Sequence, residues 1–279
     1  MTFSNCNVQP PSSSGREPAS RLPSDFVVLL WFLYSIASYV AFLASFVYFA
    51  WFTDGVGVPR TVDDGIATSS GLAVIVDVGL VLLFGLQHSV MARAGFKRML
   101  TRIIPAPLER ATFVLSSSVV LTILMWQWRP LPLVLWHVDN KVAAGLLWGI
   151  NAVGWVGVPV CSLFIDHFDL VGLKQTFSAF RRVTLRKKGF ATPLLYRYMR
   201  HPMMSSILVG FWVTPSMTLG HLLLSIGMSV YVVVGVHFEE RSLVEELGIE
   251  YERYQASTPR FVPSIITSHA STVTPPRLS

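Results

Sequence analysis

The stretch MMSSILVGFWVTPSMTLGHLLLSIGMSVYVVVGVHF, residues 203–238, decides the fold, because it runs for 36 residues without Lys, Arg, Asp or Glu. A single helix of that length would measure about 54 Å, whereas the hydrocarbon core of a bilayer is about 30 Å thick. Thr214-Pro215-Ser216 lies near its middle, where proline removes a backbone donor and disfavours helical geometry in the residue before it. The stretch therefore predicts a hairpin of two membrane helices, the first of them short.

The whole chain has the composition of a membrane protein. Of its 279 residues, 52% are hydrophobic and 14% are charged, and the mean hydropathy is +0.53. An average soluble domain has roughly 25% charged residues. These figures exclude a compact soluble domain, a disordered chain, a coiled coil and a disulfide-rich secreted fold. The two distant cysteines, Cys6 and Cys161, offer neither a disulfide framework nor metal-ligand spacing.

Four further apolar segments are long enough to cross a bilayer. They cover residues 26–52, 66–90, 111–128 and 142–165. With the hairpin they predict an all-α, polytopic membrane helix bundle of five to six transmembrane helices, five if the short half of the hairpin does not cross fully. We expect one domain over residues 26–263, between a disordered polar tail at 1–25 and a flexible tail at 264–279.

Polar and aromatic side chains at the segment ends refine this picture. Asp77 lies alone inside the second segment and should face protein or water, because an exposed charge in lipid is costly. Trp126, Trp128 and Trp136 lie at the outer end of the third segment and predict an interfacial aromatic belt.

Two loops between the segments hold most of the positive charge. Residues 91–110 carry a net charge of +4 and residues 166–202 one of +6, whereas the rest of the chain is acidic. Alternation of the spans places both loops on one side, and the positive-inside rule makes that side the cytoplasm. We expect contact with anionic headgroups of the lipid bilayer and no binding of nucleic acid, since no nucleic-acid motif accompanies the charge.

Charged and aromatic residues gather at both ends of the hairpin. Pro202 suits the first turn of a helix, whose free N–H groups favour anions. From the residues alone, this cluster is either a polar ligand site or a set of headgroup anchors beside a solvated helix exit. Its members are Arg200, His201, Pro202, Glu239, Glu240, Tyr251 and Tyr254.

The order of these motifs resembles the isoprenylcysteine carboxyl methyltransferase-like superfamily of integral membrane enzymes. The shared pattern is Arg-His-Pro, a hydrophobic hairpin, Glu-Glu-x-x-Leu, then Gly-x-x-Tyr-x-x-Tyr and a final proline. The resemblance implies a cytoplasmic site for S-adenosylmethionine beside residues 200–202. It also implies that Glu239 and Glu240 accept hydrogen bonds from the donor, and that Tyr251 and Tyr254 close over it.

Upstream motifs narrow the resemblance to the methanethiol S-methyltransferases, over roughly residues 80–263. These motifs lie at residues 83–93, 96–98, 109–112, 126–130, 167–175 and 211–221. The resemblance implies methyl transfer from S-adenosylmethionine to a small thiol, methanethiol, giving dimethyl sulfide. Three positions depart from the family pattern: Met204 and Ser206 replace an aromatic residue and a glycine, and Asp166 stands where Asn is expected.

The ends of the second and fourth segments supply candidates for the proton acceptor. A simple alkyl thiol is a weaker acid than Cys, whose reference pKa is about 8.5, so transfer to the thiolate needs a base. We expect His88 or His167 to act as general base, Asp169 to orient a histidine, and Gln87 and Asp166 to contact the substrate. Each helix end by itself could also be a polar cap. No metal is expected, because no His or carboxylate pair has firm ligand spacing.

Three other functions remain open from the sequence. A related methyltransferase would act on a prenylated cysteine carboxylate or a phospholipid and would differ in its acceptor cavity. An NnrU-like membrane protein shares part of the upstream pattern. A transporter or structural membrane protein would bind no S-adenosylmethionine.

Overall fold

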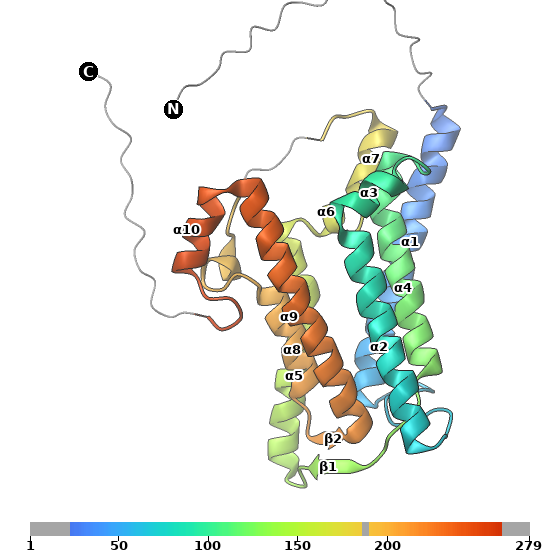
Figure 1. Ribbon diagram of the computed structural model, residues 1–279, viewed down its shortest axis with the longest axis vertical. Coiled ribbons are helices and arrows are strands. Elements are labelled where there is room, and N and C mark those ends of the chain that lie inside the picture. The colour runs from blue at the N-terminus through green and yellow to red at the C-terminus, as the bar shows by residue number, and fades with distance from the viewer. Residues whose placement is uncertain (1–22, 186–189, 264–279) are drawn as a thin grey trace, which may run out of the picture.

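The computed structural model describes residues 23–185 and 190–263, which form one bundle of helices (Figure 1). Residues 1–22 and 264–279, which hold nearly all of the two predicted tails, lie outside the described residues. The elements in chain order are α1 (Asp25–Asp54), α2 (Ser70–Ala92), α3 (Ala94–Leu100), η1 (Ala106–Leu108), α4 (Glu109–Gln127), β1 (Val134–His137), α5 (Lys141–Ile165), α6 (His167–Leu170), α7 (Leu173–Arg181), η2 (Leu194–Arg197), α8 (Pro202–Trp212), β2 (Ser216–Thr218), α9 (Leu219–Leu247) and α10 (Ile249–Ser257).

Five helices in the described part of the chain are long and apolar enough to cross a membrane: α1, α2, η1 with α4, α5 and α9. The predicted polytopic all-α bundle is therefore confirmed. Local signals fix several helix ends. Asn140 accepts the backbone N–H groups of Val142 and Ala143 at 3.0 Å and so caps the start of α5. Gly55, with a φ of 71°, ends α1 in the left-handed conformation.

The predicted hairpin is also present, and its first helix is short. α8 has 11 residues and is about 16 Å long, roughly half the hydrocarbon thickness. Pro215 lies in the connection to α9, next to β2, which pairs antiparallel with β1. Because α8 is too short to span, the described residues contain five full spans, the smaller of the two numbers expected.

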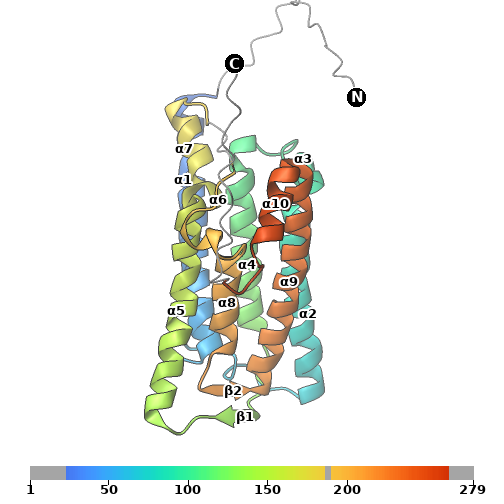
Figure 2. The same ribbon diagram turned by 90° about the vertical axis from the view of Figure 1, so that its left-hand side faces the viewer.

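The two ends of the bundle differ in character. Figures 1 and 2 show α3, α7 and α10 at one end and the β1–β2 pair at the other. The basic stretches that include α3 and α7 therefore lie at the same end of the molecule, as alternating spans require. That this end faces the cytoplasm stays a prediction from its charge.

Aromatic and small side chains join α1, α5 and α8 in the core. The rings of Phe49, Trp155 and Phe211 meet edge to face, with centroids 5.5–6.1 Å apart. Gly154 and Gly210 let α5 and α8 approach closely, since a Cβ on Gly154 would lie 2.7 Å from the Gly210 nitrogen. The short helix α8 is therefore held firmly against α5.

Ser206, one of the three departures from the family pattern, faces a glycine across the same interface. A Cβ on Gly157 would lie 2.6 Å from the Ser206 hydroxyl oxygen. That hydroxyl donates to the Pro202 carbonyl oxygen at 2.9 Å. The added side chain is thus accommodated by the absence of one on α5.

The structure separates the polar and aromatic residues that the sequence assigned to segment ends. Asp77 is fully buried, as expected, and one of its carboxylate oxygens accepts the Arg129 backbone N–H at 2.8 Å. Trp126 and Trp136 are exposed at 59% and 41%, as in an interfacial belt. Trp128 is instead a core residue, because its ring packs edge to face on Phe52 and it is only 1% exposed.

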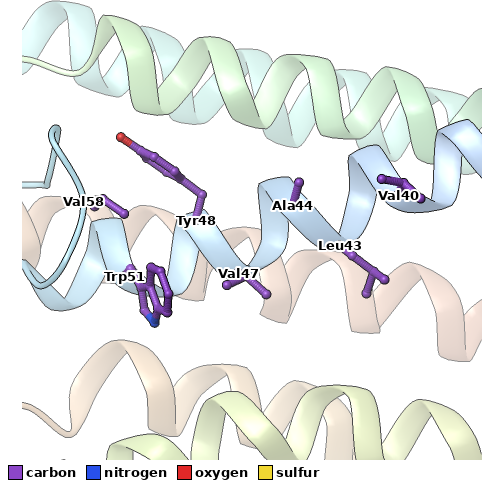
Figure 3. Close-up of a pocket in the computed structure, with 7 residues that line it drawn as sticks. All are labelled: Val40, Leu43, Ala44, Val47, Tyr48, Trp51 and Val58. Atoms are coloured by element: carbon purple, nitrogen blue, oxygen red, sulfur yellow. The ribbon is translucent and has the colours of Figure 1, made fainter.

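The outward faces of the spanning helices are apolar. Figure 3 shows one such face, a shallow groove of about 450 Å³ along α1 between Val40 and Trp51, completed by Val58. The Tyr48 hydroxyl beside this groove donates to the Arg60 carbonyl oxygen at 3.3 Å. The groove therefore offers an apolar surface to lipid and no free acid or base.

Candidate functional site

A cavity of about 320 Å³ opens between α2 and α9, toward the end of the bundle that carries α3 and α10. α8 contributes only Met204, from its first turn. The other lining residues come from the end of α2 and from one stripe of α9. They are His88, Ser89, Ala92, Arg93, Tyr231, Val232, Gly235, Val236, Phe238, Glu239, Ser242, Leu243 and Glu246.

The cavity exists because α2 and α9 diverge. Nearer the other end the two helices are in close contact, since a Cβ on Gly227 would lie 2.8 Å from the Val81 side chain. One turn further on, a Cβ on Gly85 would lie 3.3 Å from the Tyr231 ring. At Gly235 an added Cβ would meet nothing within 4 Å. The helices therefore separate beyond Tyr231, and the short α8 leaves the space between them open.

His88 is held at the cavity by its neighbours in α4. Its Nδ1 forms a hydrogen bond with the Ser117 hydroxyl at 3.2 Å, and its ring contacts that of Phe113 at 4.7 Å between centroids. Phe84 and Tyr231 enclose the ring on the other sides. Nε2 has no hydrogen-bond partner among the residues that the structure describes. One nitrogen is thus anchored and the other is free to exchange a proton.

Gln87 stands behind His88 and does not line the cavity. Its amide nitrogen donates to the Ser117 hydroxyl at 3.5 Å and contacts the Met91 sulfur at 3.1 Å. Gln87 thus contacts the residue that anchors His88, and its contact with substrate stays a prediction.

The two ends of the hairpin meet, as the sequence predicts. Glu239 lines the cavity, and its Oε2 lies 3.9 Å from His201 Nδ1. The other ring nitrogen of His201 forms a hydrogen bond of 3.1 Å with Glu240 Oε1. A buried histidine thus stands between a carboxylate at the cavity and a carboxylate behind it.

Glu240 is a fully partnered buried carboxylate. It is 3% exposed and also accepts from Arg200 Nε at 2.7 Å and from Arg260 at 2.5 Å. Arg200 Nη1 donates further to the carbonyl oxygens of Gln255 and Thr258 at 2.8 and 2.6 Å. Such a network satisfies a buried charge, and it ties α10 and the segment after it to the hairpin.

Tyr251 and Tyr254 pack away from the cavity. Their rings contact Phe190 at 5.9 and 5.4 Å between centroids, and the Tyr254 hydroxyl donates to the Tyr196 carbonyl oxygen. Burial raises the pKa of Tyr254 to about 12 and that of Tyr251 well above its usual range. Both phenols are therefore neutral at physiological pH and hold α10 in place.

His167, the second expected base, has partners on both ring nitrogens. Ser162 donates its proton to the Pro159 carbonyl oxygen at 2.7 Å, so it accepts from His167 Nδ1, also at 2.7 Å. His167 Nε2 then accepts from the Tyr39 hydroxyl at 2.9 Å. Burial lowers the pKa of this histidine. Its neutral ring joins α1 to α5 and does not line the cavity.

Asp169 and Asp166 are engaged near His167 in contacts with basic residues. Asp169 pairs with Arg110 and accepts from the Gln175 amide at 3.0 Å, where an interaction with a histidine was expected. Asp166 pairs with Lys174 at 2.5 Å. Its φ of 107° explains why the family pattern has Asn there, since Asn and Asp tolerate positive φ better than most residues. Neither aspartate lines the cavity.

Sequence reasoning missed Arg93, Tyr231 and Glu246 in the lining. The α9 members recur every three or four positions from Tyr231 to Glu246, which is the signal of one helical face. Within the described ranges, no group of three or more His, Cys, Asp or Glu side chains could hold a metal ion.

Comparisons with known proteins identify the family. The chain is 44% identical over 240 residues to methanethiol S-methyltransferase 2 of Bradyrhizobium diazoefficiens, which covers 86% of this chain and 92% of that protein. It is 45% identical over 231 residues to the methanethiol S-methyltransferase of Mycobacterium tuberculosis, covering 83% and 95%. The chain belongs to the methanethiol S-methyltransferase family. A third methanethiol S-methyltransferase, of Pseudomonas deceptionensis, is 42% identical over 248 residues, covering 89% and 95%.

More distant comparisons add little to the methanethiol S-methyltransferase assignment. Nurim of Danio rerio is 29% identical over 180 residues, covering 58% of this chain and 62% of that protein. No protein-family model matches the chain, and no solved structure is significantly similar to it.

Proposed function

We propose that the chain transfers a methyl group from S-adenosylmethionine to a small thiol, methanethiol, in the cavity between α2 and α9. One observation carries the proposal: His88, whose Nε2 has no partner in the described part of the chain, and the Glu239 carboxylate line the same cavity. The reaction and the acceptor come from the names of the relatives, which describe methanethiol S-methyltransferases.

His88 is the general base of the proposed reaction. Its Nε2 takes the thiol proton, while the hydrogen bond from Nδ1 to Ser117 keeps the ring oriented. The thiolate sulfur then forms a bond to the methyl carbon as the bond from that carbon to the sulfonium breaks. The electron pair of the broken bond stays on the donor sulfur, giving dimethyl sulfide and S-adenosylhomocysteine. The imidazolium returns its proton to water after the products leave.

The cavity suits a cationic donor. Glu239 and Glu246 both line it, and their carboxylates attract the sulfonium and the ammonium group of the donor. The aromatic rings of Phe84 and Tyr231 beside His88 exclude water from the reacting sulfur atoms. A drier site favours the reaction, because the sulfonium charge disappears during transfer.

The residues at the hairpin ends divide into two roles. Glu239 contacts the donor, and His201, Glu240 and Arg200 are positioning residues that act through Glu239. Pro202 begins α8, whose first turn brings Met204 to the cavity. The tyrosine pair, Tyr251 and Tyr254, holds α10 against the network, a role that replaces the direct cover over the donor implied by the resemblance.

The charge at the cavity end of the bundle supports a cytoplasmic site. The basic residues of α3 and α7 lie at this end and would contact anionic headgroups of the inner leaflet. The donor then comes from the cytoplasm, whereas methanethiol, which is small and apolar, reaches the cavity from the lipid.

Headspace gas chromatography of purified protein in detergent, supplied with methanethiol and S-adenosylmethionine, tests the proposal. We expect dimethyl sulfide from the wild type and at least about 100-fold less from His88→Ala, the usual effect of losing a general base. His237→Ala is the matched control, because His237 is exposed on α9 and does not line the cavity.

A pH profile separates a lost base from a damaged fold. Without His88 the reaction depends on thiolate formed in solution, so the activity of His88→Ala should rise about tenfold per pH unit below the thiol pKa. A misfolded variant would stay inactive at every pH. Near-normal turnover in His88→Ala would remove His88 from the mechanism. Methyl ester formed on a prenylated cysteine, or no binding of S-adenosylmethionine by calorimetry, would overturn the assignment itself.

A further inference from the structure

Arg200 of the Arg-His-Pro motif, the candidate to bind an anionic ligand, already has partners within the protein. Arg200 uses Nε for Glu240 and Nη1 for two carbonyl oxygens at the end of α10. Its side chain is 9% exposed and does not line the cavity. S-adenosylmethionine carries a carboxylate at the end of its methionine arm, and a guanidinium is a strong, often bidentate donor to a carboxylate. That donor has to come from elsewhere in the chain.

Arg93 is the only arginine or lysine that lines the cavity in the described part of the chain. Its guanidinium carbon lies 4.1 Å from the centroid of the Phe238 ring, a cation–π contact between the end of α2 and α9. No carboxylate of the described residues forms an ion pair with it, although Glu239 and Glu246 line the same cavity. A guanidinium on an aromatic face keeps its planar edge available for a bidentate pair.

The spacing along α2 fits the donor. Arg93 follows His88 by five residues, about 7.5 Å of helical rise. The methionine arm joins the sulfonium sulfur to the carboxylate through four bonds, about 5 Å when extended. A carboxylate hydrogen-bonded to Arg93 would therefore leave the sulfonium methyl at the depth of His88.

We propose that Arg93 binds the donor carboxylate. The Arg93 guanidinium lies against the Phe238 ring and pairs with the carboxylate when the donor binds. The inference rests on the proposed function, since it assigns one more residue to the same site. Arg93 thereby distinguishes S-adenosylmethionine from sulfonium compounds that lack the carboxylate. Glu239 and Glu246 bind the cationic groups of the donor, so the cavity has partners for both the positive and the negative groups of the donor.

Titration calorimetry on the full chain in detergent tests the inference without turnover. The two probes are S-adenosylhomocysteine and its analogue that lacks the carboxylate. We expect the wild type to prefer the carboxylate form by about 10- to 100-fold, the range of a charge-assisted bidentate pair. Arg93→Met should lose most of this preference. Arg93→Lys should keep an intermediate part, because lysine retains the positive charge but lacks the two parallel N–H donors of a guanidinium.

Arg98→Met is the matched control, since Arg98 is an exposed arginine of the neighbouring α3 and lies outside the cavity. It should keep the wild-type preference. An equal preference in Arg93→Met and wild type, or no preference in the wild type, would overturn the assignment of Arg93. Dimethyl sulfide production by the wild type, measured in parallel, distinguishes that result from failure of the proposed function.

Discussion

Two histidines occupy similar places at the same end of the bundle, yet their surroundings differ. His88 lies near the end of α2 with Nδ1 hydrogen-bonded to Ser117, and its Nε2 has no partner within residues 23–185 and 190–263. His167 follows the end of α5 with Nδ1 on Ser162 and Nε2 on Tyr39. Only His88 lines the cavity between α2 and α9.

The difference shows what separates a reactive histidine from a structural one. A general base needs one nitrogen fixed by the protein and the other directed at the substrate. A histidine with two satisfied nitrogens contributes to stability, because removal of either partner leaves a buried polar atom unpaired. Three experiments test this contrast, beginning with the largest expected effect on activity.

The serine partners of the two histidines should have opposite effects. Ser117→Ala removes the anchor of His88 Nδ1, and we expect kcat/KM to fall about tenfold, the loss of one hydrogen bond at the reacting group. Ser162→Ala should leave kcat/KM close to wild type and lower the melting temperature instead. Both quantities are measured on the same detergent preparations. The reverse pattern would exchange the roles of the two histidines.

The stability effect at His167 should depend on pH. Its pKa is lowered by burial, so the unfolded chain binds a proton more readily than the folded chain. The stability that neutral His167 contributes is therefore complete above pH about 6.5 and declines as the pH falls below that value. At pH 7.5, His167→Phe should cost about 1–3 kcal/mol of unfolding free energy.

The difference in unfolding free energy between wild type and His167→Phe should become smaller as the pH falls from 7 to 5, as measured by denaturant unfolding. His137 is exposed on β1, so His137→Phe is the matched control for replacing a histidine by phenylalanine. A difference for His167→Phe that widens toward acid pH would contradict a neutral buried ring.

Asp169 should give the smallest effect. Its pair with Arg110 is about one-third exposed on both sides, and such pairs contribute at most about 1 kcal/mol. We expect Asp169→Asn to lower stability by less than that amount and to change kcat/KM less than twofold. A loss of tenfold or more in kcat/KM would return Asp169 to the catalytic group that the sequence suggested.

The membrane architecture could be predicted from the sequence because it depends on local properties. Continuous apolar length identifies a span, and Pro215 with the length of residues 203–238 identifies a turn. The length of the apolar stretch also predicted that Arg200 and Glu240 lie close together, because a hairpin brings its two ends to one side of the membrane. The cavity-lining residues of α9 also follow a helical period in the sequence.

Other features required positions that the sequence does not give. Trp128 and Trp126 are two residues apart, yet the end of α4 turns one into the core and leaves the other exposed. In the sequence, Arg200 is a candidate anion ligand, but in the fold it is hydrogen-bonded to a carbonyl oxygen of α10. Arg93 is one of several basic residues in the sequence, and only the divergence of α9 from α2 places it in the cavity lining.

The sequence by itself determined a helical membrane protein, the limits of its spans and the common side of its basic loops, because hydrophobicity and charge act along contiguous residues. Only the tertiary structure decided which titratable groups stay available for chemistry. Ser117 lies 29 residues from His88, and Tyr39 lies 128 residues from His167. A nitrogen becomes free or satisfied through partners that the packing of distant helices brings to it, and no local pattern carries that information.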